Sequence, residues 1–190
     1  MNIRELLDEK KAVFELENSV EQNTQEVFDM MREYVNEVFM EQEDVYLNLE
    51  EKHVSVAAYN SRFGIQKFDD VSILRDPELI TETGIDALKE TTNWKKIALD
   101  TSRNEFITGL IMFYSQHDSL GLQQEIGRLY VNKDKRVIFR GLVGGMRIEI
   151  MDAELLEAQL PEILQSCMED AFFEGCTYWD EEEELELMRV

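Results

Sequence analysis

Carboxylates are the side chains that dominate the possible chemistry of this sequence. The 190 residues include 41 Asp and Glu against 19 Lys and Arg, which gives a net charge of −22 at pH 7. Five acids are separated by three, four, four and four residues, which on a helix places them in one row, about 6 Å apart along the axis: Glu26, Asp29, Glu33, Glu37 and Glu41. Like charges four residues apart cost roughly 0.2–0.5 kcal/mol a pair, and an ordinary solvated face would mix in lysines. The row is therefore a candidate partner-binding surface.

The excess negative charge lies at the two ends of the chain. Residues 1–60 hold 15 acids and 5 bases, residues 61–148 hold 12 and 13, and residues 149–190 hold 14 and 1. The last segment contains a block of like charge, which usually forms a solvated tail and which we take as a second partner contact: Asp180, Glu181, Glu182, Glu183 and Glu184. This charge opposes direct binding to nucleic acid or anionic lipid and favours a cationic partner.

Patterns for catalysis, cofactors and metals are weaker. Carboxylates can serve as general acids and bases, but so many acids make any assignment uninformative. We interpret His53 as a sheet-surface residue and His117 as a turn residue, since no nucleophile motif frames a triad. Gly141, Gly144 and Gly145 lack the spacing of phosphate-binding loops and indicate a turn. We predict a protein that is not an enzyme and has no cofactor and no structural metal, with a metal-dependent hydrolase or nuclease left as an open alternative.

The cysteines and the N-terminal residues point to the cytoplasm. Cys167 and Cys176 have no second pair and no neighbouring histidine that would complete a zinc set, and free thiols suit a reducing compartment. Acids occupy the N-terminal positions that a signal peptide keeps apolar, and no run of 18 apolar residues occurs. We therefore predict a cytoplasmic protein that does not associate with a membrane, with Cys167 in its core.

Basic residues gather in the last part of the neutral segment, at Arg128, Arg136, Arg140 and Arg147. Arg136 and Arg140 share a strand face with Ile138 if that segment is extended. A nucleic-acid surface there would work against the field of the whole protein. We therefore expect these arginines to pair with the acidic helices, either within one chain or across a homodimer.

The acidic row needs a helix, and the sequence predicts one over residues 24–41. Asn23 followed three residues later by Glu26 is the pattern of a capping box, and apolar residues then recur at helical spacing: Val27, Met31, Tyr34, Val35 and Val38. Residues 3–7 fit a short helix, whereas residues 12–17 fit either a helix or a strand.

The middle of the chain alternates like an antiparallel sheet. Strands are predicted at 45–49, 54–58, 63–65, 71–73, 94–99, 129–131, 137–142 and 146–150, and residues 106–114 form either a central strand or a buried helix. Asp76 and Pro77 indicate the start of a helix. Asp152 caps a C-terminal amphipathic helix, which Pro161 kinks or divides.

These elements predict an α+β fold. A single domain over residues 1–176 contains an antiparallel β-sheet, with an acidic N-terminal helical segment and a C-terminal amphipathic helix. Residues 177–190 form an acidic tail.

Two functions follow from this organisation. A rigid array of carboxylates can imitate the charge of nucleic acid and occupy the basic groove of a nucleic-acid-binding protein. In its short length, acidity and lack of a catalytic motif, the chain resembles small acidic phage inhibitors of bacterial defence nucleases, including some anti-CRISPR proteins. That resemblance implies a non-enzymatic inhibitor of a nuclease or defence effector.

The alternative is an adaptor. Residues 129–172, two strands followed by a long amphipathic helix, resemble the end of the secretion-chaperone fold, whose members are small, acidic and dimeric. This resemblance implies a protein that binds an extended segment of a partner. The longer acidic helical segment at the front and Pro161 in the last helix depart from that fold, so no binding residue is carried over.

Overall fold

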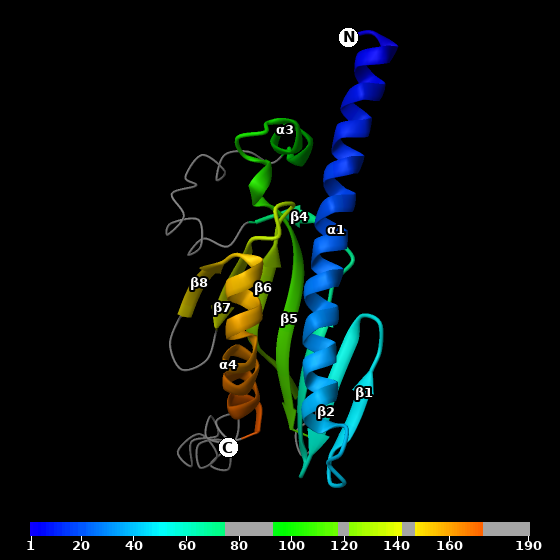
Figure 1. Cartoon of the computed structure of the whole chain (residues 1–190). Helices are drawn as coiled ribbons and strands as arrows, with labels where there is room; N and C mark the ends of the chain where they lie inside the picture. The colour runs from blue at the N-terminus through cyan, green and yellow to red at the C-terminus, as the bar shows by residue number, and fades with distance from the viewer. Residues whose placement is uncertain (75–92, 118–121, 142–146, 173–190) are drawn as a thin grey trace, which may run out of the picture.

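The fold is α+β, as the sequence predicts, with an antiparallel sheet between N-terminal and C-terminal helices (Figure 1). The structure is a computed structural model that describes residues 1–74, 93–117, 122–141 and 147–172. The helix predicted at Asp76 and Pro77 and the acidic tail lie outside these residues. Among the described helices, none combines the length and the apolar composition needed to cross a bilayer.

A single long helix, α1 (Ile3–Phe39), opens the chain. Its capping box is formed by Asn2 and Glu5, with the Glu5 amide donating to Asn2 Oδ1 at 2.9 Å. The predicted start at Asn23 is wrong. Asn23 and Glu26 have the same residue types and spacing as Asn2 and Glu5, but they do not cap the helix. Asn23 lies in mid-helix because residues 13–35 offer a continuous apolar stripe that packs against the sheet, and tertiary packing keeps the chain helical on both sides of a local start signal. Residues 12–17 are helical.

The sheet has eight strands, of which seven follow the order β1-β2-β3-β5-β6-β7-β8 and β4 pairs with β5. Every pairing is antiparallel. The long β5 is central, so its segment forms a strand rather than a buried helix. The bounds are β1 (Tyr46–Leu49), β2 (His53–Ala58), β3 (Ser61–Lys67), β4 (Ser72–Ile73), β5 (Ile107–His117), β6 (Leu122–Val131), β7 (Val137–Gly141) and β8 (Arg147–Met151).

Two predictions, a strand at 94–99 and a break at Pro161, need correction. Residues 94–99 form a short helix, α3 (Trp94–Leu99), rather than a strand, because Asn93 caps it by accepting from the Lys96 amide; a 3-10 turn, η2 (Asn104–Phe106), follows. The last helix, α4 (Ala153–Phe172), begins at Asp152 as predicted, since the Leu155 amide donates to Asp152 Oδ1 at 2.8 Å. It runs through the exposed Pro161 and is not divided there.

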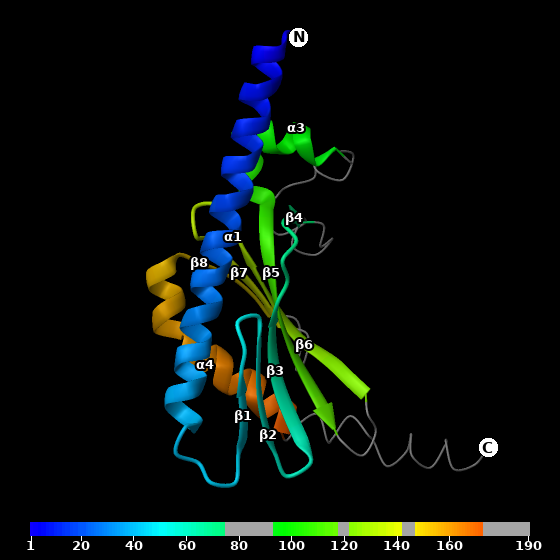
Figure 2. The ribbon, with the colours of Figure 1, turned by 90° about the vertical axis from the view of Figure 1, so that its right-hand side faces the viewer.

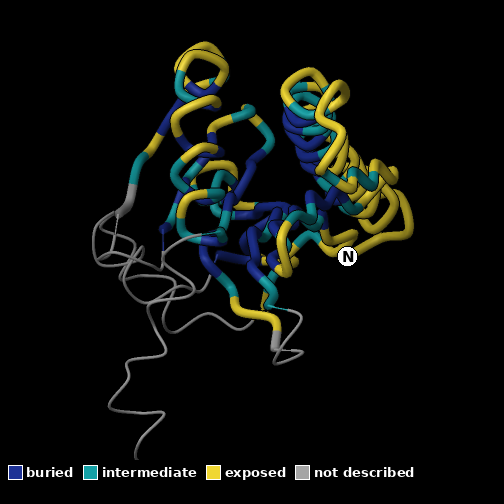
Figure 3. The backbone as a smooth tube through the Cα atoms, turned by 90° about the horizontal axis from the view of Figure 1, so that it is seen from below, coloured by how far each residue is buried: buried dark blue, intermediate teal, exposed yellow. Residues whose placement is uncertain are grey.

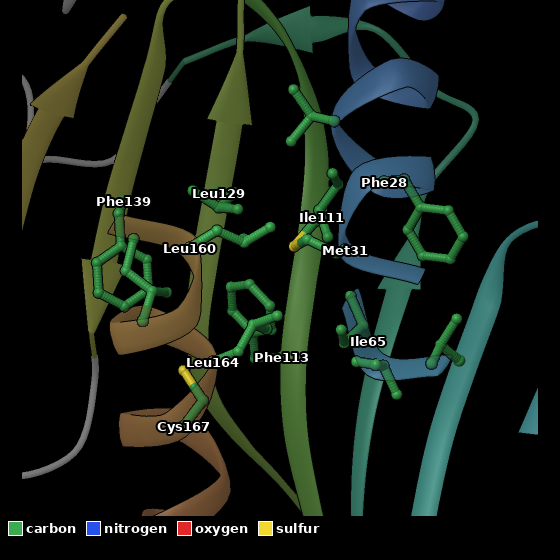
Figure 4. Close-up of a cluster of buried hydrophobic side chains, with 14 of the residues drawn as sticks. Phe28, Met31, Ile65, Ile111, Phe113, Leu129, Phe139, Leu160, Leu164 and Cys167 are labelled. Carbon is green, nitrogen blue, oxygen red and sulfur yellow. The ribbon is translucent and has the colours of Figure 1, made fainter. Parts of the chain in front are cut away.

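Both long helices cover the same face of the sheet (Figure 3). The buried apolar residues of α1 and of α4 pack against the side chains that the central strands direct toward these helices, and together they form one core. Figure 4 shows Phe113 of β5 beside Leu160 and Leu164 of α4, and Met31 of α1 beside Ile111. Cys167 is buried in this core, as predicted. The other face of the sheet carries no helix among the described residues.

Helix α1 approaches the sheet closely at Gly109 of β5. A Cβ added to Gly109 would lie 2.1 Å from Thr24 Oγ1, and Thr24 itself is buried and donates to the Val20 carbonyl at 2.7 Å. Only a residue without a side chain lets the helix lie this close to the strand.

We predict that Gly109→Ala destabilises the protein. The added methyl group forces α1 away from β5, and overpacking of this kind costs about 1–3 kcal/mol. Urea unfolding followed by circular dichroism measures the loss. Gly127→Ala is the matched control, since its Cβ would lie 3.2 Å from the nearest atom and requires a smaller shift. Equal stability of Gly109→Ala and the unmodified protein would contradict this packing.

Candidate functional site

The acidic row lies on the outer side of α1, opposite the buried stripe. Glu26, Glu33 and Glu37 are exposed and Asp29 is half-exposed, while Glu41 is exposed in the turn that follows the helix. The sheet and α4 therefore fix the helix from one side only. The carboxylates of the row face solvent, which is where a partner could reach them.

The first two members of the row have cationic partners. Lys135 Nζ, in the turn between β6 and β7, lies 2.6 Å from Glu26 Oε2, and this lysine lowers the pKa of the Glu26 carboxyl. Arg32 Nη2 lies 3.0 Å from Asp29 Oδ1. No ion pair from a described residue reaches Glu33, Glu37 or Glu41. The uncompensated charge is thus concentrated in the C-terminal half of the row.

Two further carboxylates join the row through the fold. The turn between β1 and β2 carries Glu50 and Glu51, both exposed, and packs against the flank of α1. Arg32 Nη1 donates to the Glu50 carbonyl at 3.4 Å, and Gln25 Nε2 donates to the Glu51 carbonyl at 3.3 Å. The sequence indicated a turn at these residues, but nothing in it shows that this turn docks on the acidic helix.

The turn between β6 and β7 holds the other flank of α1. Asn132 Oδ1 accepts from the amides of Asp134 and Arg136 at 3.0 Å each, which shapes the turn. Asn23 Nδ2 then donates to the carbonyls of Asn132 and Lys133 at 3.1 and 2.8 Å. The predicted helix cap is therefore a side chain that locks a hairpin to the middle of α1.

Two of the arginines lie on the far side of the sheet from the acidic helix. Leu129 and Phe139 point into the core, so Arg128 and Arg140, which alternate with them, lie on the face of the sheet opposite α1 and α4. Arg128 pairs with Glu125 of its own strand, which raises the pKa of the guanidinium. The expected pairing with the acidic helices within one chain is wrong for Arg128, because the sheet stands between them. Lys135 makes that contact instead.

The two histidines lie at opposite ends of the β2–β3 hairpin: His53 pairs with Gln66, whereas His117 pairs with Ser61. His53 shares a hydrogen bond with Tyr114 and stacks on its ring, with 5.8 Å between the ring centroids. Burial lowers the pKa of His53 and raises that of Tyr114, so both are neutral at pH 7. His53 is half-buried on the sheet, close to its prediction, whereas His117 ends β5 rather than occupying a turn.

The face of the sheet opposite the helices contains a small apolar cavity of about 190 Å³. Phe106, Tyr130, Ile138 and Ile150 form its apolar walls, and Arg136 and Glu105 lie among its polar lining residues. Ile150 is 47% exposed. Aromatic and aliphatic side chains beside an arginine are the composition of protein-binding surfaces.

Other predicted sites receive no structural account. Asp180, Glu181, Glu182, Glu183 and Glu184 lie outside the described residues. Within those residues, no three His, Cys, Asp or Glu side chains are placed to hold a metal ion.

We predict that Lys135→Met raises the pKa of Glu26 toward the ordinary value of an exposed carboxyl. The lysine favours the ionised carboxylate, so its loss favours the protonated form. Carboxyl titration by NMR measures the change. Lys133→Met is the control, because Lys133 lies beside Asp134 and not beside Glu26. An unchanged Glu26 pKa in the Lys135 variant would show that the Lys135–Glu26 pair does not form in solution.

The chain matches no protein-family model, no curated protein and no solved structure at a significant level of similarity.

Proposed function

We propose that the protein is a non-enzymatic inhibitor that binds a basic nucleic-acid-binding protein, a nuclease or defence effector, by presenting carboxylates in place of phosphates. The contact is the acidic surface formed by Glu33, Glu37, Glu41, Glu50 and Glu51. The observation that carries the proposal is that these five exposed carboxylates lie along one flank of α1 without an ion pair from any described residue. In this proposal the acidic tail provides a second contact.

The array is fixed before binding. Val27, Phe28, Met31 and Val35 are fully buried beneath the outer face of α1, so the helix cannot turn its acids away from solvent. Neighbouring carboxylates on the helix are about 6 Å apart along the axis. A preorganised array loses little conformational freedom when it binds, and this favours affinity.

A basic groove supplies the complementary charge. Lysines and arginines that neutralise phosphates gain affinity through release of condensed counterions. Carboxylates that occupy the same groove compete for those bases, and charge complementarity steers the encounter and selects the partner. Because Glu26 and Asp29 are already paired, the groove would centre on the C-terminal half of α1.

The first experiment is an affinity pull-down from a bacterial lysate with washes at low and then high salt. We expect recovery of a basic nucleic-acid-binding protein that elutes as salt rises, since exposed charges are screened over about 8 Å at physiological ionic strength. Added duplex DNA or RNA should compete for the recovered protein. A partner that nucleic acid fails to displace would contradict the proposal.

We predict that the triple variant Glu33→Lys, Glu37→Lys and Glu41→Lys weakens partner binding by on the order of tenfold to a hundredfold, because each reversal replaces an attraction with a repulsion. Calorimetry at two salt concentrations measures the loss. The control reverses three exposed acids of α4: Glu154, Glu157 and Glu169. Equal losses from both triple variants would mean that net charge, rather than this surface, governs binding.

An adaptor is the second candidate, and the cavity on the opposite face of the sheet favours it. A partner segment could insert an apolar side chain between Tyr130, Ile138 and Ile150 and place an acidic side chain beside Arg136. Such a contact would depend mainly on apolar burial and would therefore survive a high-salt wash.

We predict that Ile150→Glu abolishes any capture that survives high salt, because it places a charge in the wall of the cavity. Leu155→Glu is the matched control, since Leu155 is a 42% exposed apolar residue of α4. Repeating the pull-down with both variants tests the adaptor function. Salt-resistant capture that Ile150→Glu leaves intact would contradict it.

A further inference from the structure

The N-terminal turns of α1 extend past the end of the sheet (Figure 1 and Figure 2). At 1.5 Å a residue the 37-residue helix is about 55 Å long, whereas the 11 residues of β5 span about 36 Å. None of the described strands therefore lies beneath its first turns. Among the described elements only α3 packs beside this end, where Lys95 Nζ lies 2.8 Å from Glu9 Oε2.

The projecting end carries an apolar stripe that faces solvent. Ile3, Leu7 and Phe14 are 80%, 61% and 54% exposed, and Lys10 lies between them. These positions are separated by four, three and four residues, the spacing at which one α-helix packs along another. The buried positions Val13, Leu16 and Val20 belong to a separate stripe that faces the fold. Packing among the described residues thus does not explain the exposed stripe.

Two residues of the stripe, Leu7 and Lys10, also line a groove beside α3. Its volume is about 840 Å³, and its other lining residues include Leu6 of α1 and Trp94 of α3. An indole and several aliphatic side chains provide the apolar walls that a helix can fill.

The charge of this end differs from that of residues 18–60, which follow it in the chain. Residues 1–17 hold three bases and five acids, and α3 adds Lys95 and Lys96, so this pole is close to neutral. Residues 18–60 hold two bases and ten acids. For two chains of net charge −22, approach at this pole meets less repulsion than approach at the acidic row.

We propose that this stripe is a dimer interface, in which α1 of a second copy packs antiparallel along Ile3, Leu7, Lys10 and Phe14. About a two-fold axis, Ile3 of one copy lies against Phe14 of the other, and Leu7 against the alkyl chain of Lys10. The two sheets then extend from opposite ends of the paired helices. This arrangement keeps the acidic bodies farther apart than the Debye length of about 8 Å, and an isologous contact of this kind closes without forming a filament.

Sedimentation velocity and light scattering of the full chain over a range of concentrations test the proposal. We expect a species of twice the 22.3 kDa chain mass that dissociates on dilution. The double variant Leu7→Glu and Phe14→Glu should be monomeric at the same concentrations, because it places charges in the seam. Val38→Glu, at a 42% exposed residue of the same helix outside the stripe, should stay dimeric. Circular dichroism checks that each variant is folded.

A monomer at every concentration would overturn the proposal, whatever the variants do, and so would a dimer that the double variant leaves intact. Capture of a different protein's helix by a monomeric chain would assign the stripe to another occupant and would also overturn it. Orientation is tested by mixing Ile3→Cys and Phe14→Cys chains in a Cys176→Ser background. Mixed disulfide dimers should exceed those of either variant alone, and a preference for self-pairing would rule out the antiparallel arrangement.

Discussion

The burial of two amphipathic helices against one face of one sheet is the constraint on which the rest of this structure depends. The stripes of α1 and α4 form a single core with the inward residues of the strands. Gly109 allows α1 to approach β5 closely enough to bury Thr24. Once that stripe is buried, the outer side of α1 must face solvent, and the acids of the row with it.

The same constraint separates the charges of opposite sign. Side chains alternate between the two faces of a strand, so burying Leu129 and Phe139 under α4 and α1 places Arg128 and Arg140 on the other face. The sheet then stands between these arginines and the carboxylate row. On the face opposite the helices, a local partner such as Glu125 neutralises Arg128. On the helix side, among the described residues, only Lys135 and Arg32 form ion pairs with the carboxylate row. The protein therefore has two chemically different faces. The proposed inhibitor would use the acidic face formed by α1, and the alternative adaptor would use the opposite face of the sheet.

Much of the fold was predictable because its signals are local. The hairpin of β1 and β2, the turn between β6 and β7, the strand β8 and the cap at Asp152 all follow from alternation, turn residues and a single capping side chain. The errors arose where one local pattern fits two structures. Asn23 and Glu26 repeat the pattern of Asn2 and Glu5, yet only the latter pair caps a helix. Residues 94–99 contain apolar positions compatible with a strand, but Asn93 caps a short helix that packs on α1.

The α+β class, the row of carboxylates along a helix and the concentration of charge at the two ends of the chain can all be inferred from the order and periodicity of the residues. Three other features depend on tertiary packing: Lys135 neutralises Glu26, Glu50 and Glu51 join the row, and the N-terminal turns of α1 extend beyond the sheet. Each of these depends on which distant segments pack together and on how the length of a helix compares with that of the strands beneath it. Long-range packing determines which segments meet and where the helix extends beyond the strands. A local pattern of residues carries no information about such packing.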